Sequence, residues 1–341
     1  MGFFFKKKDN VVSESTTITN PENTMKGTTP MNESQTVVLS YRTEDDLRSV
    51  CRKEIETLEH WTRRLIHETL TAQYGEDYFS YKNNDEPLIK GEITARVNKM
   101  REDNPGRFPR PIDAFFLGDI IYVLCKKPLY DSHFKAALSE AYPHNNEETR
   151  FFLEKVEAIR NKLSHANSIS IREAEQVICY CHDVIESLKA YYRQTGKEKE
   201  YNVPMFIRAT DSLGNVFLPE KDGYPLRLYR DTSKPITAGE YGIKLRAGET
   251  YGLSVVVDPA FDPSSYSLEW TVLSGLIGDN YKKKWKNVTQ IDFPVENKTV
   301  GSSFEITCRL TTNKDWHKHN RYDDCFEVNV YTVLPPIDDN Y

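Results

Sequence analysis

A short stretch of the chain, residues 160–165, gathers side chains that suit the chemistry of a phosphate. In order they are Arg160, Asn161, Lys162, Leu163, Ser164 and His165. Arginine supplies a permanent, planar cation that matches phosphate oxygens. Histidine supplies the one ring whose unperturbed pKa allows proton transfer near neutral pH. The stretch therefore predicts a site for a phosphate-bearing ligand or substrate.

The stretch ends a segment, residues 147–164, that we expect to be an amphipathic helix because its apolar residues lie near helical spacing. On an ideal helix Arg160 and His165 would point roughly 140° apart, since each residue turns the chain by about 100°. Asn161 and His165, at i and i+4, would share a face. Two arrangements would bring Arg160 and His165 to one phosphate. Either the helix ends or distorts near Ser164, or two copies of the motif face each other across a dimer axis.

The whole chain of 341 residues is long enough for two domains. Residues 1–42 are rich in Ser, Thr, Asn and Pro and lack periodicity, so we expect a disordered tail. Residues 43–196 carry helical apolar patterns and predict an all-α bundle. Residues 197–210 have the composition of a charged linker, and residues 211–341 change to a period of two, which predicts an all-β sandwich. The expected fold class is therefore α + β and multidomain.

The same patterns place the individual elements. We expect helices over residues 43–74, 92–102, 113–125, 130–142, 147–164 and 171–192. We expect strands over residues 226–228, 251–257, 266–273, 288–293, 304–310 and 325–333. Thr43 is a plausible N-cap for the first helix, and Gly75 is a natural stop. His67 and Glu68 on that helix are expected at the surface, where they could line the same cleft as the motif.

The predicted sandwich has features of an immunoglobulin-like core. Trp270 lies in the middle of one expected strand and Cys308 lies two strands later, although a paired cysteine on the earlier strand is missing. A basic run, residues 282–286, includes Trp285 and falls between expected strands. It is either a solvated loop or a clamp that holds a nucleic-acid backbone and stacks a base.

Within the predicted bundle, the motif resembles the signature of the HEPN superfamily. That signature is an Arg, four to six residues and a His, with Asn, Asp or His preferred after the Arg; Arg160, Asn161 and His165 satisfy each element. The first long helix adds to the resemblance through residues 65–70 and 74–79, which are similar to the opening of one branch of the superfamily. The resemblance covers roughly residues 43–196.

The resemblance implies a metal-independent endoribonuclease that acts as a homodimer, in a toxin or antiviral defence setting. The RNA 2′-hydroxyl would attack the adjacent phosphate and leave a 2′,3′-cyclic phosphate and a 5′-hydroxyl. As catalytic residues, His165 would act as general base or acid, Arg160 would stabilise the charged transition state, and Asn161 would orient His165 or contact phosphate. Lys162 and Ser164 are substrate-binding candidates. No metal or other cofactor is expected.

Two other interpretations stay open. Arg160 and His165 could simply be capping and dipole partners near a helix C-terminus. Alternatively, the protein is a non-catalytic binding scaffold, in which the helical part dimerises and the sandwich recognises a regulatory partner or trigger.

Composition narrows the class of protein and its partners. The net charge of −6 is unlike that of a non-specific nucleic-acid binder, so RNA would have to meet a local patch. No run approaches the roughly 18 apolar residues that cross a bilayer, so no membrane partner is expected. Three aromatic residues precede the first lysines, whereas an export signal places its cations first. We therefore expect a cytoplasmic protein.

Overall fold

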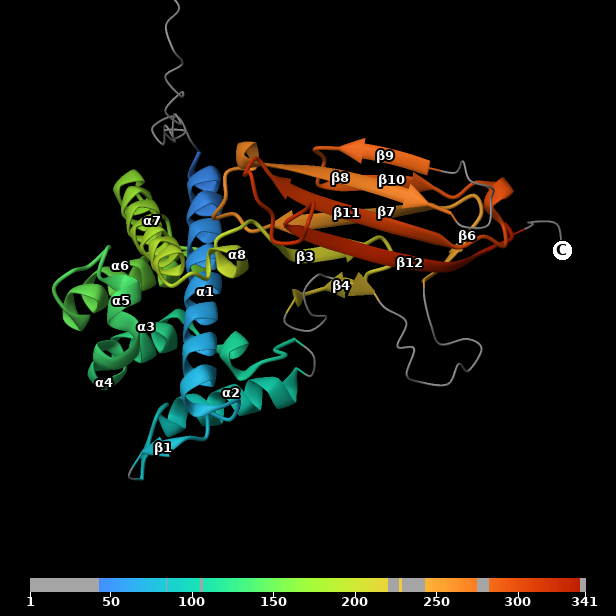
Figure 1. Ribbon diagram of the computed structural model, residues 1–341. Coiled ribbons are helices and arrows are strands. Elements are labelled where there is room, and N and C mark those ends of the chain that lie inside the picture. The colour runs from blue at the N-terminus through green and yellow to red at the C-terminus, as the bar shows by residue number, and fades with distance from the viewer. Residues whose placement is uncertain are drawn as a thin grey trace, which may run out of the picture. The chain divides into compact units, whose positions relative to one another are not determined.

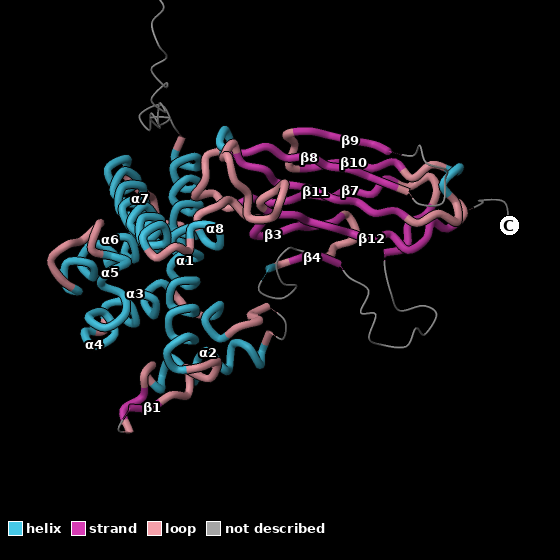
Figure 2. Tube along the Cα trace, viewed as in Figure 1, coloured by secondary structure: helices cyan, strands magenta, loops and turns pink. Residues whose placement is uncertain are grey.

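A computed structural model describes residues 43–83, 85–104, 107–219, 227–228, 243–274 and 282–337. The expected disordered tail, residues 1–42, lies outside the described residues. The described chain is a mixed α + β protein in which a helical part precedes a sheet-rich part (Figures 1 and 2), as the change of periodicity predicts. No helix among the described residues is both long and apolar enough to span a membrane.

The helical part is organised on a long helix, α1, which runs from Glu44 to Tyr74. Thr43 and Asp46 form a capping box at its start, and Gly75 follows its end with a φ of 85°. The other main helices are α2 (Gly91–Asp103), α3 (Leu117–Cys125), α6 (Asn146–Ser164) and α7 (Ile171–Gln194). Short strands β1 (Lys82–Asn83) and β2 (Glu86–Pro87) pair between α1 and α2. The apolar stripe of α1 is buried in the core that α3, α6 and α7 share with it.

Two predicted helices differ from the structure. The segment 113–125 is not one helix: a 3-10 turn, Pro111–Ala114, precedes α3, and the backbone is extended at Phe115 and Phe116. The break occurs because Asp119 caps α3 by accepting a hydrogen bond from the Phe116 amide at 2.7 Å. The helix expected at 130–142 begins and ends earlier: α4 (Lys127–Leu129), a π-helical turn (Tyr130–Phe134) and α5 (Lys135–Leu138) follow one another without a gap.

The sheet-rich part contains two sheets that share one apolar core. The four-stranded sheet has the order β10-β7-β3-β4, and the larger sheet has the order β5-β12-β11-β8-β9, with β6 also paired to β12. Their bounds are β3 (Phe206–Asp211), β4 (Val216–Phe217), β5 (Arg227–Leu228), β6 (Ile243–Arg246), β7 (Thr250–Val257), β8 (Tyr266–Leu273), β9 (Lys282–Lys286), β10 (Gln290–Pro294), β11 (Phe304–Thr312) and β12 (Asp324–Leu334). Phe293 of β10 meets Phe304 of β11 edge-on across the core, with ring centroids 5.2 Å apart. Trp270 and Cys308 are direct cross-strand partners on β8 and β11.

Two segments expected to be irregular are ordered. The expected linker, 197–210, holds a short helix, α8 (Glu198–Tyr201), and most of β3, so the sheet-rich part begins before residue 211. Asp324 fixes the start of β3 by accepting a hydrogen bond from the Phe206 amide at 2.7 Å. The basic run is not a loop but β9, an edge strand paired with β8. Trp285 packs against the sheet core, which leaves it unsuited to stacking a base.

Helix α1 contacts the sheet-rich part through one buried carboxylate. Asp258, at the end of β7, accepts hydrogen bonds from the indole nitrogen of Trp61 at 3.1 and 3.3 Å and from the backbone amide of Ala260 at 3.0 Å. The guanidinium of Arg64 lies 3.6 Å from the same carboxylate. Because the Asp258 side chain is fully buried, these donors replace the water that it loses on folding.

Candidate functional site

Helix α6 ends immediately after the predicted motif. His165 is its C-cap, and Ala166 adopts a left-handed conformation with a φ of 56°. The amide of Asn167 donates to the carbonyl of Lys162 at 3.0 Å, and the amide of Ala166 donates to that of Leu163 at 3.4 Å. This pattern is a Schellman motif, with alanine at the position that usually holds glycine. The end expected near Ser164 is confirmed, and it takes His165 out of the regular helix.

Two arginines from the first turns of α1 hold the end of α6. Arg48 donates to the carbonyl of Asn167 at 2.5 Å and to that of Leu163 at 3.4 Å. Arg52 donates to the same Leu163 carbonyl at 3.4 Å. Cations are favourable here because the last carbonyls of a helix have no partner within the helix and carry partial negative charge. The path of the chain after Ser164 therefore depends on α1.

The two helices enclose a groove of about 280 Å³ that contains part of the motif. Its lining residues are Arg52, Ile55, Glu56, Glu59, Arg160, Leu163 and Ser164. Arg160 is half-buried, and it shares the groove with the second cation, Arg52. Glu59 is held by an ion pair with Arg63 at 2.6 Å. Two guanidinium groups can thus hold a phosphate here, while the two carboxylates limit how much negative charge the groove accepts.

The remaining motif residues lie outside this groove. Asn161, Lys162 and His165 are exposed. Lys162 pairs with Glu173 at the start of α7, and this pair, with Ser170, lowers the pKa of the Glu173 carboxyl. The side chains of Arg160 and His165 make no hydrogen bond to each other, or to any other described residue. One copy of the chain therefore does not join these two groups directly, and both remain available to a ligand.

The pKa of one neighbouring carboxylate, that of Glu157, depends on its burial and on nearby charges. Burial raises the pKa of Glu157, one turn before Arg160, and Glu154 raises it further, while the Arg160 cation acts in the opposite direction. The Ser164 hydroxyl donates to the carbonyl of Arg160 at 3.0 Å, so its proton is used inside the helix. In this geometry Ser164 can accept, but not donate, a hydrogen bond to a ligand.

Sequence reasoning misses the contribution of α1 to the groove. Arg48, Arg52 and Glu56 follow one another at intervals of four along the polar face of α1. The helix dipole gives no signal here, because it acts within the first turn and both arginines lie beyond the first turn of α1. Glu68, which we expected at the surface or in the motif's cleft, lines a different cavity.

The chain was compared with models of protein families and with curated proteins. No family model matches the chain, and no curated protein matches it.

Proposed function

We propose that this protein is a metal-independent endoribonuclease, with a HEPN-like helical domain and an immunoglobulin-like β-sandwich, and that it acts as a homodimer. The observation that carries the proposal is the environment of Arg160. Its guanidinium shares a groove with Arg52, five residues before an exposed histidine that ends the same helix. The cation of Arg160, which lines the groove, and the exposed imidazole of His165 are the two kinds of group that the cleavage of a phosphodiester uses.

The proposed reaction uses the exposed imidazole of His165 and the cation of Arg160. His165 removes the proton of the RNA 2′-hydroxyl, whose oxygen attacks the adjacent phosphorus as the bond to the 5′-oxygen breaks. A protonated histidine returns a proton to that leaving oxygen, so the products are a 2′,3′-cyclic phosphate and a 5′-hydroxyl. Arg160 stabilises the charge that builds on the phosphoryl oxygens. Asn161 contacts the phosphate or orients His165, and Lys162 holds the RNA once it exchanges Glu173 for a phosphate.

A second copy of the chain completes the proposed site. Arg160 and His165 have no direct contact within one chain, whereas two motifs across a dimer axis would supply two of each group. A regulatory partner or trigger would bind the sandwich, in the toxin or antiviral setting that the HEPN resemblance implies. The alternative is a non-catalytic scaffold that dimerises through its helices and binds a partner through its sheets. The ion pair that occupies Lys162 favours this alternative.

The test is cleavage of tRNA and mixed single-stranded RNA in EDTA, with mass spectrometry of the product ends. The proposal predicts cyclic phosphate ends from the parent chain and their loss in Arg160→Ala and His165→Ala. Arg193→Ala and His144→Ala are matched controls because both side chains are exposed in the helical part and lie outside the groove. Mixing the two inactive variants tests the dimer, since a composite site should recover part of the activity. Absence of cleavage by every protein would favour the scaffold.

A further inference from the structure

A second cluster of polar side chains surrounds a cavity of about 270 Å³ on another face of α1. The lining residues are His60, Arg64, Glu68, Arg110, Glu200, Tyr201, Met205 and Lys318. They come from α1, from the loop before the 3-10 turn at residue 111, from α8 and the segment after it, and from the loop between β11 and β12. The cavity is therefore built by parts of the chain that are far apart in sequence.

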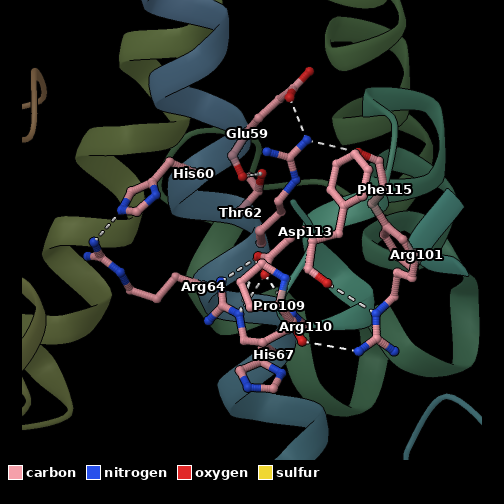
Figure 3. A network of polar contacts seen from close by, with 12 residues as sticks. Glu59, His60, Thr62, Arg64, His67, Arg101, Pro109, Arg110, Asp113 and Phe115 are labelled. Atoms are coloured by element: carbon pink, nitrogen blue, oxygen red, sulfur yellow. Dashed lines mark hydrogen bonds and ion pairs between the residues drawn. The ribbon is translucent and has the colours of Figure 1, made fainter. Parts of the chain in front are cut away.

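Arg64 is the fixed cation of this cavity and is 8% exposed. It donates to Nε2 of His60 at 2.8 Å (Figure 3). It also pairs with Asp258 at 3.6 Å and lies over the Trp61 ring at 5.0 Å. A guanidinium can only donate, so Nε2 of His60 accepts, and the neutral ring carries its proton on Nδ1. His60, which lines the cavity, thus keeps one N–H donor, on Nδ1.

Arg110 is the second cation, and it is held in a defined geometry. Its guanidinium donates to both carboxylate oxygens of Asp113, at 2.7 to 3.2 Å, and the Arg110 amide donates to the same carboxylate at 2.9 Å (Figure 3). Lys318, the third cation, is half-buried, and its backbone amide donates to Asp323 at 3.0 Å. Three cations on separate segments therefore converge on one cavity.

Burial has the largest influence on the pKa values of the groups that line this cavity. Burial, together with Arg64 and Arg110, lowers the pKa of His60 to about 4. Burial, assisted by Arg64, lowers the pKa of Lys318. Two acids also line the cavity. Glu200 is exposed, and burial raises the pKa of Glu68 to about 7, so Glu68 is only partly ionised at neutral pH.

We propose that this cavity binds a small organic phosphate, no larger than a mononucleotide, with its phosphate against Arg64, Arg110 and Lys318. Glu68 and Glu200 accept hydrogen bonds from hydroxyl or amino groups at the other end of the ligand. The volume of about 270 Å³ falls just below the range of about 300–1,000 Å³ that is typical of small-molecule pockets, and it therefore excludes larger ligands. This binding is separate from the proposed RNA cleavage and needs neither Arg160 nor His165.

Calorimetric titration of the full chain tests the proposal, with pyrophosphate, the four ribonucleoside 5′-monophosphates and their nucleosides as probes. At least one monophosphate should bind, pyrophosphate should bind more weakly, and the nucleosides should not bind. A charged hydrogen bond contributes about 1.5–3 kcal/mol, so Lys318→Gln and Arg110→Gln should each weaken binding about ten- to hundredfold. Lys314→Gln, in the same loop but outside the cavity, should stay within about twofold.

A stability measurement separates a ligand site from a structural one. Because burial disfavours the Lys318 cation, Lys318→Gln should keep or raise the melting temperature while it weakens binding. If the cluster served stability alone, Lys318→Gln would lower the melting temperature and leave binding unchanged. Lys318→Arg, which keeps the charge, should retain binding.

Chemical labelling of the unaltered chain avoids the risk that a variant fails to fold. Acetic anhydride should acetylate Lys318, and the bound monophosphate should protect it, while Lys314 labels equally with and without ligand. The proposal is overturned if no phosphate-bearing probe binds at millimolar concentration, or if binding neither protects Lys318 nor responds to its substitution. Lys318-dependent binding of a single-stranded RNA oligonucleotide, without binding of any mononucleotide, would also overturn it.

Discussion

Ala166→Gly should stabilise the protein, because alanine occupies a left-handed position at the end of α6. The left-handed conformation costs an L-residue about 1–2 kcal/mol, whereas glycine adopts it without that cost. Glycine also gives the unfolded chain more freedom, which offsets about 0.4–1 kcal/mol. Ala166 is exposed, so no buried methyl is lost. The net expectation is a gain of about 0.5–1 kcal/mol in the free energy of unfolding.

The assay is urea denaturation followed by circular dichroism, with Ala158→Gly as the matched control. Ala158 is an exposed residue inside the same helix, where glycine costs about 1 kcal/mol. The same chemical change should therefore act in opposite directions at two positions eight residues apart. A loss of stability in Ala166→Gly, as large as that in Ala158→Gly, would refute the proposed end of α6 and the position of His165 that depends on it.

Three further results are expected. Asp258→Ala should cost about 3–5 kcal/mol in urea denaturation, because Trp61 and Arg64 lose their buried acceptor. Burial raises the pKa of Glu68 from 4.5 to about 7 in the folded chain, so the free energy of unfolding falls as pH rises through that window. Glu68→Gln should remove this fall. The variant should therefore be more stable than the parent at pH 8 but not at pH 4. Glu56→Gln should raise RNA affinity by up to about fivefold in a filter-binding assay, since it removes a carboxylate from the groove.

Each of these results has an internal check. Asp315→Ala removes an exposed acid and should change stability by under about 0.5 kcal/mol. An equal loss in Asp258→Ala and Asp315→Ala would contradict the buried network. Glu175→Gln changes the net charge equally but lies outside the groove, so a similar rise in RNA affinity would point to overall charge. A pH profile of Glu68→Gln identical to that of the parent would show that Glu68 is not the group responsible.

Apolar periodicity predicted the helices that bury one face and the strands whose side chains alternate between core and solvent. The stripe of α1, with Thr43 and Gly75 at its ends, is an example, and so is β8, whose observed bounds match the prediction. Periodicity failed where a tertiary contact decides the structure. The lysines of β9 suggested a solvated loop, yet pairing with β8 turns Lys282, Lys284 and Lys286 outward, whereas Lys283 and Trp285 share the half-buried face. The start of β3 depends on Asp324, which lies 118 residues later in the chain.

The candidate site shows the same division. The motif itself was visible because its residues are contiguous, and the end of α6 followed from local polarity. The sequence did not indicate the groove, because Arg52 belongs to α1 and contacts the carbonyl of Leu163, which lies 111 residues later in the chain. The cavity around Arg64 draws on four segments that no local pattern connects. Local sequence therefore indicated the candidate groups, and packing decided which of them share a space.

The most direct test of the proposed function is the first-order rate constant for cleavage of single-stranded RNA in EDTA. General acid–base catalysis contributes about 10²–10⁴-fold, so His165→Ala should lower this constant by at least about a hundredfold. Arg160→Ala should lower it by about 10²–10³-fold, as expected for the loss of a group that stabilises the transition state. Equal rate constants for the parent chain and His165→Ala, with both proteins folded, would contradict the proposal.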